Sequence, residues 1–252
     1  MSHLVYCVCE NGPRAPKGIE GICQRPVTLV ESSGLAAVVS DLPGGEHHRR
    51  IQEVVRYARV VEAFSQQRTV IPMRYGCCLS TEAAVKELLD QNQKQYRQTL
   101  ERLRDCVEMG VRVLGRRQFG DGESEHPAPQ PVTVGSPSGV AYLAARWAEF
   151  KARDSAAQDC GRVADWLRAG LAGLFKESVV EAGSFGGQSV ASVFFLVRRE
   201  RIERFREVFA GLCSSQQAAV LLTGPWPPYN FVKTAASRDD LERRGANGSA
   251  RS

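Results

Sequence analysis

The chain has 252 residues, of which 33 are lysine or arginine, 28 are aspartate or glutamate, and 43% are hydrophobic. This composition is typical of a folded globular protein and excludes collagen-like, fibrous and wholly disordered chains. The net charge of +5 is spread along the sequence without a block of like charges, so the charge pattern gives no support to nucleic-acid binding.

A membrane-spanning segment is not predicted. The longest uncharged stretch, from Gly211 to Val232, is interrupted by three prolines and several polar residues. The first ten residues lack the basic segment of a signal peptide. We therefore expect an unprocessed cytoplasmic protein that has no lipid membrane as a partner.

The eight cysteines are too dilute to build a disulfide scaffold, and we expect them to stay reduced. In extended backbone, Cys7 and Cys9 point to one face, whereas the adjacent Cys77 and Cys78 point to opposite faces. No CxxC or HxxxH spacing occurs, so the cysteines are interpreted as small buried hydrophobic residues and no metal site is predicted.

The first elements alternate strand and turn patterns. Glycine at position 34 can take a positive φ, so the Ser32–Gly34 segment is expected to close a hairpin between two strands. A loop is predicted for Asn11–Pro26, which is rich in proline and glycine. The predicted strands are Leu4–Glu10, Val27–Glu31, Leu35–Leu42 and Val70–Ser80.

Two helices are predicted around the last of these strands. The first ends near Arg68, and its core face is expected to hold Ile51, Val54, Val55, Ala58 and Val61 or Glu62. The second has Thr81 as its N-cap and an apolar seam that runs to Val107. At 1.5 Å per residue it would be about 40 Å long, so it is expected to bridge two domains.

The second half has the element order βαββαβ, which is that of a ferredoxin-like unit with two helices on one face of a sheet. A further helical stripe lies between Val163 and Phe175. The predicted elements are the strand Val111–Leu114, the helix Val140–Phe150, the strands Ser178–Glu181 and Val190–Arg198, the helix Ile202–Leu212 and the strand Ala218–Leu222.

The predicted fold class is therefore α+β with two domains. The boundaries are 1–80 for an N-terminal α+β domain, 81–109 for the bridging helix, and 110–232 for a ferredoxin-like domain. The residues from 233 to 252 are expected to form a disordered tail, and the proline-rich Asp121–Ser138 segment is expected to be exposed.

No catalytic motif or cofactor site is predicted. The sequence has no Gly-x-Ser-x-Gly elbow and no phosphate-binding lysine loop, and the glycine-rich 183–187 stretch is interpreted as a hairpin turn. The histidines His3, His47, His48 and His126 lie at a terminus, a turn or a loop. The carboxylates of Glu62, Glu101 and Glu108 are interpreted as surface or terminal charges of helices.

Two segments have unusual sequences. Val70–Gly76 places a proline in an extended run, which is tolerated at a strand start or sheet edge. Thr223–Phe231 holds three prolines that withhold amide donors, so it is expected to be stiff and unable to join a regular strand ladder. Its aromatic residues are interpreted either as a lid that packs over the sheet or as a surface that binds a partner.

These two segments, Val-Ile-Pro-Met-Arg-Tyr-Gly and Leu-Thr-Gly-Pro-Trp-Pro-Pro-Tyr-Asn-Phe, resemble the two signatures of the gas vesicle protein F/L family. Further points of similarity are Tyr6, the strand from Gly34 to Val39, Val60–Glu62 and Gly139–Leu143. The resemblance covers roughly residues 4 to 232. The family usually has phenylalanine in place of Tyr75 and often histidine in place of Tyr57, so no histidine role is transferred to Tyr57.

The resemblance implies a non-catalytic assembly factor or minor structural component of gas vesicles. It implies as partners the main gas vesicle shell protein and other gas vesicle accessory proteins, without nucleic acid and without a cofactor. A different class of function, a ferredoxin-like domain that binds a small molecule or acts as an enzyme, predicts a closed pocket with convergent polar groups.

The candidate site residues come from the two signatures. The lid is favoured for Trp226, whereas Tyr229 and the edge with Arg74 and Tyr75 are favoured as the contact. The interaction candidates are Arg74, Tyr75, Tyr229 and Phe231, and the residues expected to shape the signatures are Pro72, Gly76, Gly224, Pro225, Trp226, Pro227 and Pro228.

Overall fold

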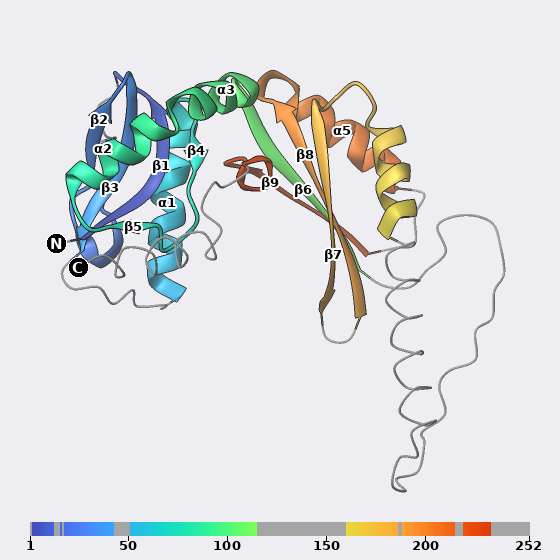
Figure 1. Ribbon diagram of the computed structural model, residues 1–252. Helices are drawn as coiled ribbons and strands as arrows, with labels where there is room; N and C mark the ends of the chain where they lie inside the picture. Colours follow the sequence, from blue (N-terminus) through green and yellow to red (C-terminus); the bar gives the residue numbers. More distant parts are fainter. Residues whose placement is uncertain are drawn as a thin grey trace, which may run out of the picture. The chain divides into compact units, whose positions relative to one another are not determined.

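The computed structural model describes residues 2–12, 16, 18–42, 51–114, 160–185, 188–214 and 219–232 (Figure 1). The chain forms two compact units, one of residues 1–108 with 225–252 and the other of residues 109–224. The predicted helix Val140–Phe150, the proline-rich Asp121–Ser138 segment and the 233–252 tail all lie outside the described residues. The two units, called unit 1 and unit 2 below, are each described separately.

Unit 1 contains an antiparallel sheet whose central strand is β1. The strand order is β2-β3-β1-β4, and β5 also pairs with β1. The predicted hairpin is confirmed, since Ser33 and Gly34 turn the chain with φ of 51° and 74°. The strands are β1 (Ser2–Glu10), β2 (Thr28–Ser32), β3 (Leu35–Leu42), β4 (Ile71–Pro72) and β5 (Cys78–Leu79).

The continuous strand predicted for Val70–Ser80 is wrong. β4 and β5 are each two residues long, and a turn separates them. In this turn the amide of Cys77 donates to the carbonyl of Arg74 at 3.1 Å, and Gly76 has a φ of 90° that favours glycine. Pro72 lies in β4, next to β1 at the sheet edge, as expected for a proline in a strand.

Helices cover both faces of this sheet. One face packs on α1 (Ile51–Gln67), and the other packs on α2 (Glu82–Gln91) and α3 (Gln93–Leu103) (Figure 1). The register of β1 against β3 shifts between Val5 and Cys7, so Tyr6 and Cys7 both face α1. Cys7 and Cys9 therefore share a face, and Cys77 and Cys78 pack on opposite sides of the sheet, as predicted.

The predicted core face of α1 is wrong except at Val61, which is buried. Ile51, Val54 and Val55 are 74%, 38% and 43% exposed. The helix instead buries a neighbouring stripe of larger side chains, Tyr57, Val60, Val61 and Phe64. Both stripes have helical spacing, so periodicity alone could not decide between them; the aromatic rings of Tyr57 and Phe64 bury more apolar area.

The long bridging helix is also wrong. Its start is as predicted, because the Thr81 hydroxyl accepts from the amide of Ala84 at 3.1 Å. However, Asn92 leaves helical geometry between α2 and α3, and α3 ends at Leu103. Both helices pack on the sheet of unit 1, with Leu89, Tyr96 and Leu100 in the same buried cluster. The apolar spacing in the sequence continues across the break because α2 and α3 both pack on the same face of the sheet.

Unit 2 holds most of a second sheet with the strand order β7-β8-β6-β9. Its core joins this sheet to the helix of residues 160–170 and to α5 (Ile202–Cys213), through Leu167, Phe195 and Phe205 among others. β7 and β8 pair antiparallel as far as Phe185 and Gln188, which confirms the predicted hairpin, although Gly183–Phe185, expected in its turn, belong to β7. The strands are β6 (Cys106–Leu114), β7 (Glu177–Phe185), β8 (Gln188–Arg198) and β9 (Ala219–Trp226).

The predicted α+β class is confirmed by two sheets that are each packed on helices. Two strands continue past the borders between the units. β6 begins at Cys106 and β9 ends at Trp226, so unit 1 includes the first residues of β6 and the last residues of β9. The C-terminal signature is therefore divided, and its residues from Pro225 onward belong to unit 1.

Candidate functional site

The first signature packs on Tyr57, a residue of α1 that is 3% exposed. Its hydroxyl lies 2.7 Å from the carbonyl oxygen of Met73 and 3.0 Å from that of Tyr6. The ring of Tyr75 meets the ring of Tyr57 edge-on at 5.2 Å, and the ring of Tyr6 lies at 5.1 Å on another side. Tyr57 therefore holds the first signature against both α1 and β1. We call this region, with the Pro225–Phe231 segment, the signature junction.

The first signature is fixed in its backbone and partly open in its side chains. The amide of Met73 donates to the carbonyl of Tyr6 at 2.9 Å, which anchors the segment to β1. Arg74 is exposed and Tyr75 is half-buried. The guanidinium of Arg74 forms no hydrogen bond or ion pair with any residue that the structure describes. A rigid loop therefore presents one cation and one aromatic ring.

The second signature departs from two expectations. It was expected not to join a strand ladder, yet β9 continues through Gly224 and Pro225 to Trp226. Gly224 has a φ of 109°. Glycine takes this angle without steric cost, whereas a residue with a β-carbon would be strained there. The lid interpretation of Trp226 required burial, but its side chain is 46% exposed.

The remaining residues of the strip divide into buried and exposed sets. Pro227 and Pro228 are buried, and Phe231 is 4% exposed, so Phe231 cannot present its ring to a partner as proposed from the sequence. The short helix Tyr229–Phe231 leaves Tyr229 38% exposed. The buried residues fix the strip, Trp226 faces solvent, and Tyr229 exposes part of its surface while its hydroxyl is buried.

A buried carboxylate holds this strip in place. Glu108, which is 4% exposed, accepts from the amide of Asn230 at 2.8 Å and from its side-chain nitrogen at 2.8 Å. The guanidinium of Arg102 donates to the carbonyl of Phe231. The sequence interpretation placed Glu108 on a helix surface, which is wrong because it lies in β6. A glutamate in an apolar strand pattern, Cys-Val-Glu-Met, is the signal that could have indicated this role.

Burial controls the ionisable groups of the junction. It raises the pKa of Tyr57 well above its usual value, and the nearby Tyr229 hydroxyl and Cys7 thiol add to the effect. The pKa of Tyr229 is also raised, chiefly by burial. Burial raises the pKa of the Cys9 and Cys77 thiols to about 11. These groups are protonated at neutral pH, so the junction offers hydrogen-bonding and aromatic contacts rather than a nucleophile.

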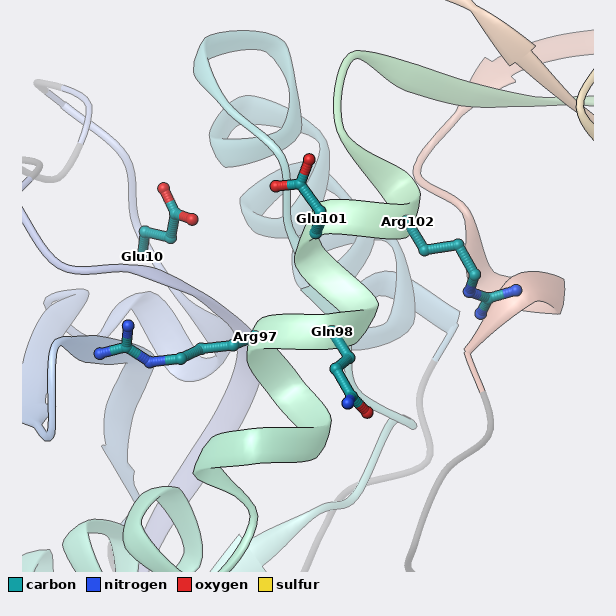
Figure 2. Close-up of a pocket in the computed structure, with 5 residues that line it drawn as sticks. All are labelled: Glu10, Arg97, Gln98, Glu101 and Arg102. Carbon is teal, nitrogen blue, oxygen red and sulfur yellow. The ribbon is translucent and has the colours of Figure 1, made fainter.

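The open groove beside α3 does not form a convergent binding site. The groove has a volume of about 610 Å³ and is lined by Glu10, Arg97, Gln98, Glu101 and Arg102. Figure 2 shows Arg97 and Arg102 extending to opposite sides of α3. Arg97 donates to the carbonyl of Ser33 at 3.0 Å, and Glu101 accepts from Arg104 at 2.9 Å, so these charges serve the fold.

Two other site classes find no candidate within the described residues. No group of three or more histidine, cysteine, aspartate or glutamate side chains is arranged there to hold a metal ion. Among the same residues, no helix has the length and apolar character needed to cross a membrane. The signature junction is therefore the candidate site, as an interaction surface.

The family of the chain follows from comparison with known proteins. The model of the family "Gas vesicle synthesis protein GvpL/GvpF" matches residues 2–233. The chain belongs to the GvpL/GvpF family. A role in gas vesicle formation follows from this membership, and the resemblance seen in the two signatures is confirmed.

Relatives in the family match along most of the chain. Gas vesicle protein L of Streptomyces sp. (strain CB03234) is 27% identical over 238 residues, which cover 87% of this chain and 88% of that protein. Gas vesicle protein F of the same organism is 26% identical over 247 residues, covering 92% of this chain and 100% of that protein.

Solved GvpF structures share the fold. The crystal structure of GvpF from Microcystis aeruginosa has a TM-score of 0.68 at 13% identity and covers 91% of this chain and 98% of that one. The structure of GvpF from Anabaena sp. PCC7120 has a TM-score of 0.67 at 15% identity, covering 93% and 97%. At these low identities the similarity shows that the chain shares the α+β fold of these proteins. It does not show that any individual residue contact is shared.

Proposed function

We propose that the protein is a non-catalytic accessory protein of gas vesicle assembly that acts in the cytoplasm. In this proposal it binds the main gas vesicle shell protein and other accessory proteins through the signature junction. The observation that carries the proposal is that Tyr75, whose ring meets the buried Tyr57 edge-on, and Tyr229, which contributes to the raised pKa of Tyr57, come from the two family signatures and remain partly exposed.

The physical basis is a rigid aromatic surface. Tyrosine and tryptophan side chains are enriched among residues that contribute most to binding, because they bury a large area at a low entropy cost. Trp226 and Tyr229 are 46% and 38% exposed, and the Glu108–Asn230 hydrogen bonds hold their backbone. Such a surface could cover the apolar face of a shell subunit until it is incorporated, as a chaperone does.

The same proposal includes a ferredoxin-like assignment for unit 2. It is supported by the strand order β7-β8-β6-β9, by the β7–β8 hairpin, and by two helices that share one core with the sheet. The range suggested by the structure is 109–224, rather than the 110–232 expected from the sequence.

Paired measurements of binding and stability test the proposal. Tyr229→Ala, Trp226→Ala and Arg74→Ala are compared for capture of the purified shell protein and for thermal unfolding. We expect binding to fall by about 2 kcal/mol for the aromatic variants, while the melting temperature changes little. Leu221→Ala is the matched control, because this side chain is 51% exposed but lies in unit 2. Unchanged capture by all three variants would refute the proposed surface.

A further inference from the structure

An asparagine–glycine pair, Asn11 and Gly12, follows β1 directly. Both residues are exposed to solvent. The amide of Gly12 donates to the side-chain oxygen of Asn11 at 2.7 Å. The main-chain nitrogen of Gly12 therefore lies beside the side-chain amide group of Asn11, and joining this nitrogen to the side-chain carbon would close a succinimide ring. Asparagine is one of the residues that proteins lose by such slow chemical change.

The backbone at Gly12 leaves the reacting atoms open. Gly12 has a φ of 117°, an angle that residues with a β-carbon rarely adopt. Among the described residues, no atom outside the two chain neighbours lies within 4 Å of the position that a β-carbon would take there. No described side chain therefore obstructs ring closure or the approach of water.

The other two asparagines that the structure describes are held in less reactive settings. Each donates its side-chain nitrogen to an oxygen at 2.8 Å, Asn92 to the carbonyl of Leu88 and Asn230 to the carboxylate of Glu108. Each is also followed by a residue with a side chain, which hinders attack by the main-chain nitrogen. The two residues are therefore internal references for the chemistry at Asn11.

We propose that Asn11 is a site of spontaneous deamidation. The nitrogen of Gly12 gives up its proton to a base in the solvent and attacks the side-chain carbon of Asn11. The bond from that carbon to the side-chain nitrogen breaks, and the nitrogen takes up a proton and leaves as ammonia. Water then opens the succinimide at either of its two carbonyl carbons, which gives aspartate or isoaspartate at position 11. Water is consumed and ammonia is released, and nothing is oxidised or reduced.

The product is expected to keep the fold of unit 1. The amide of Asn11 donates to the carbonyl of Gly34 at 3.0 Å, and the extra main-chain atom of isoaspartate is inserted after this amide. The reaction lowers the net charge of +5 by one. The new carboxylate adds to a recess of about 250 Å³ that Asn11 lines. Attraction and repulsion oppose each other there, because the charged residues that also line it are Glu10, Arg68, Arg104 and Asp105.

Peptide mapping of the full chain tests the proposal. The protein is incubated at mildly alkaline pH, and mass spectrometry follows the conversion of amide to acid at each asparagine. Isoaspartate is scored with an isoaspartyl methyltransferase. We expect conversion at Asn11 to be many-fold faster than at Asn92 or Asn230, to accelerate with hydroxide concentration, and to give both products. Asn247, which also precedes a glycine, lies outside the described residues and is distinguished by its own peptide.

Two variants separate ring closure from general lability. Gly12→Ala adds a β-carbon beside the attacking nitrogen, so it is expected to slow conversion at position 11 several-fold without changing Asn92 or Asn230. Asn11→Gln would require a larger and less favourable ring, so conversion at this position is expected to disappear. Asn11→Asp supplies the product charge and is expected to co-elute with the aspartate product on ion exchange. Conversion no faster than at Asn92 and Asn230, an absence of isoaspartate at position 11, or an unchanged rate in Gly12→Ala would overturn the proposal.

Discussion

Tyr57→Phe removes a single oxygen from the centre of the signature junction. That hydroxyl is 2.7 Å from the carbonyl oxygen of Met73, and the side chain is 3% exposed. A lost hydrogen bond costs about 0.5–1.5 kcal/mol, and a buried acceptor left without its donor costs about 1–3 kcal/mol. We expect unfolding of unit 1 to become easier by about 1–3 kcal/mol, while the phenylalanine ring keeps the contacts with Tyr6 and Tyr75.

Tyr96→Phe is the matched control. Tyr96 is 7% exposed and packs on the opposite face of the same sheet, but its hydroxyl has no hydrogen-bond partner among the described residues. We expect this variant to lose no more than about 0.5 kcal/mol. Both variants are compared with the parent chain by urea unfolding, and hydrogen exchange reports on the 70–76 segment. Equal losses in the two variants would show that the Tyr57 hydroxyl does not anchor the first signature.

Three further predictions concern other parts of the molecule. Glu108→Gln replaces an oxygen that accepts from Asn230 with an amide that donates, so we expect the free energy of unfolding to fall by about 1–3 kcal/mol and hydrogen exchange at Asn230 to become faster. Glu101→Gln, at an exposed position, is expected to change neither quantity by this much. Gly224→Ala places a β-carbon on backbone with a φ of 109°, so thermal unfolding should show a loss of about 1–3 kcal/mol; Gly211→Ala, inside α5, should be neutral or stabilising. The free energy of unfolding is expected to fall as pH rises from 9 to about 11, because the thiols of the unfolded chain ionise near 9.0 while burial keeps the pKa of Cys9 and Cys77 at about 11. Urea denaturation at several pH values checks the sign of this change, and Cys77→Ala is expected to flatten the decline.

Local sequence patterns predicted much of the sheet structure, the family and the buried faces of α2, α3 and α5, but they did not predict the buried face of α1 or the break between α2 and α3. The hairpin at Ser33 and Gly34 follows from turn chemistry, which depends on a few neighbouring residues. The buried side of α1 depends on which of two apolar stripes meets β1, and that is decided by partners distant in sequence. The break at Asn92 is invisible for the same reason, since α2 and α3 contact one sheet face.

The site showed the same limit. Proline and glycine in the signatures correctly indicated constrained backbone, and the aromatic residues indicated an exposed or packed surface. Which aromatic residue is buried could not be read from the sequence, and Phe231 and Trp226 were each assigned to the wrong side. Tyr57 and Glu108 were missed as anchors because their partners, Met73 and Asn230, are brought to them only by the tertiary fold.

The division of unit 1 along the chain has a consequence for the order in which the protein matures. The strip from Pro225 onward completes unit 1, but it is translated only after the whole of unit 2. At about 5–20 residues per second, a ribosome needs on the order of ten seconds for the intervening segment. During that interval Glu108 lacks its hydrogen-bond partner Asn230, and Tyr229 has not yet been synthesised. A nascent chain, or one truncated before Pro225, therefore lacks the Pro225–Phe231 part of the signature junction, and unit 1 is complete only in the finished molecule.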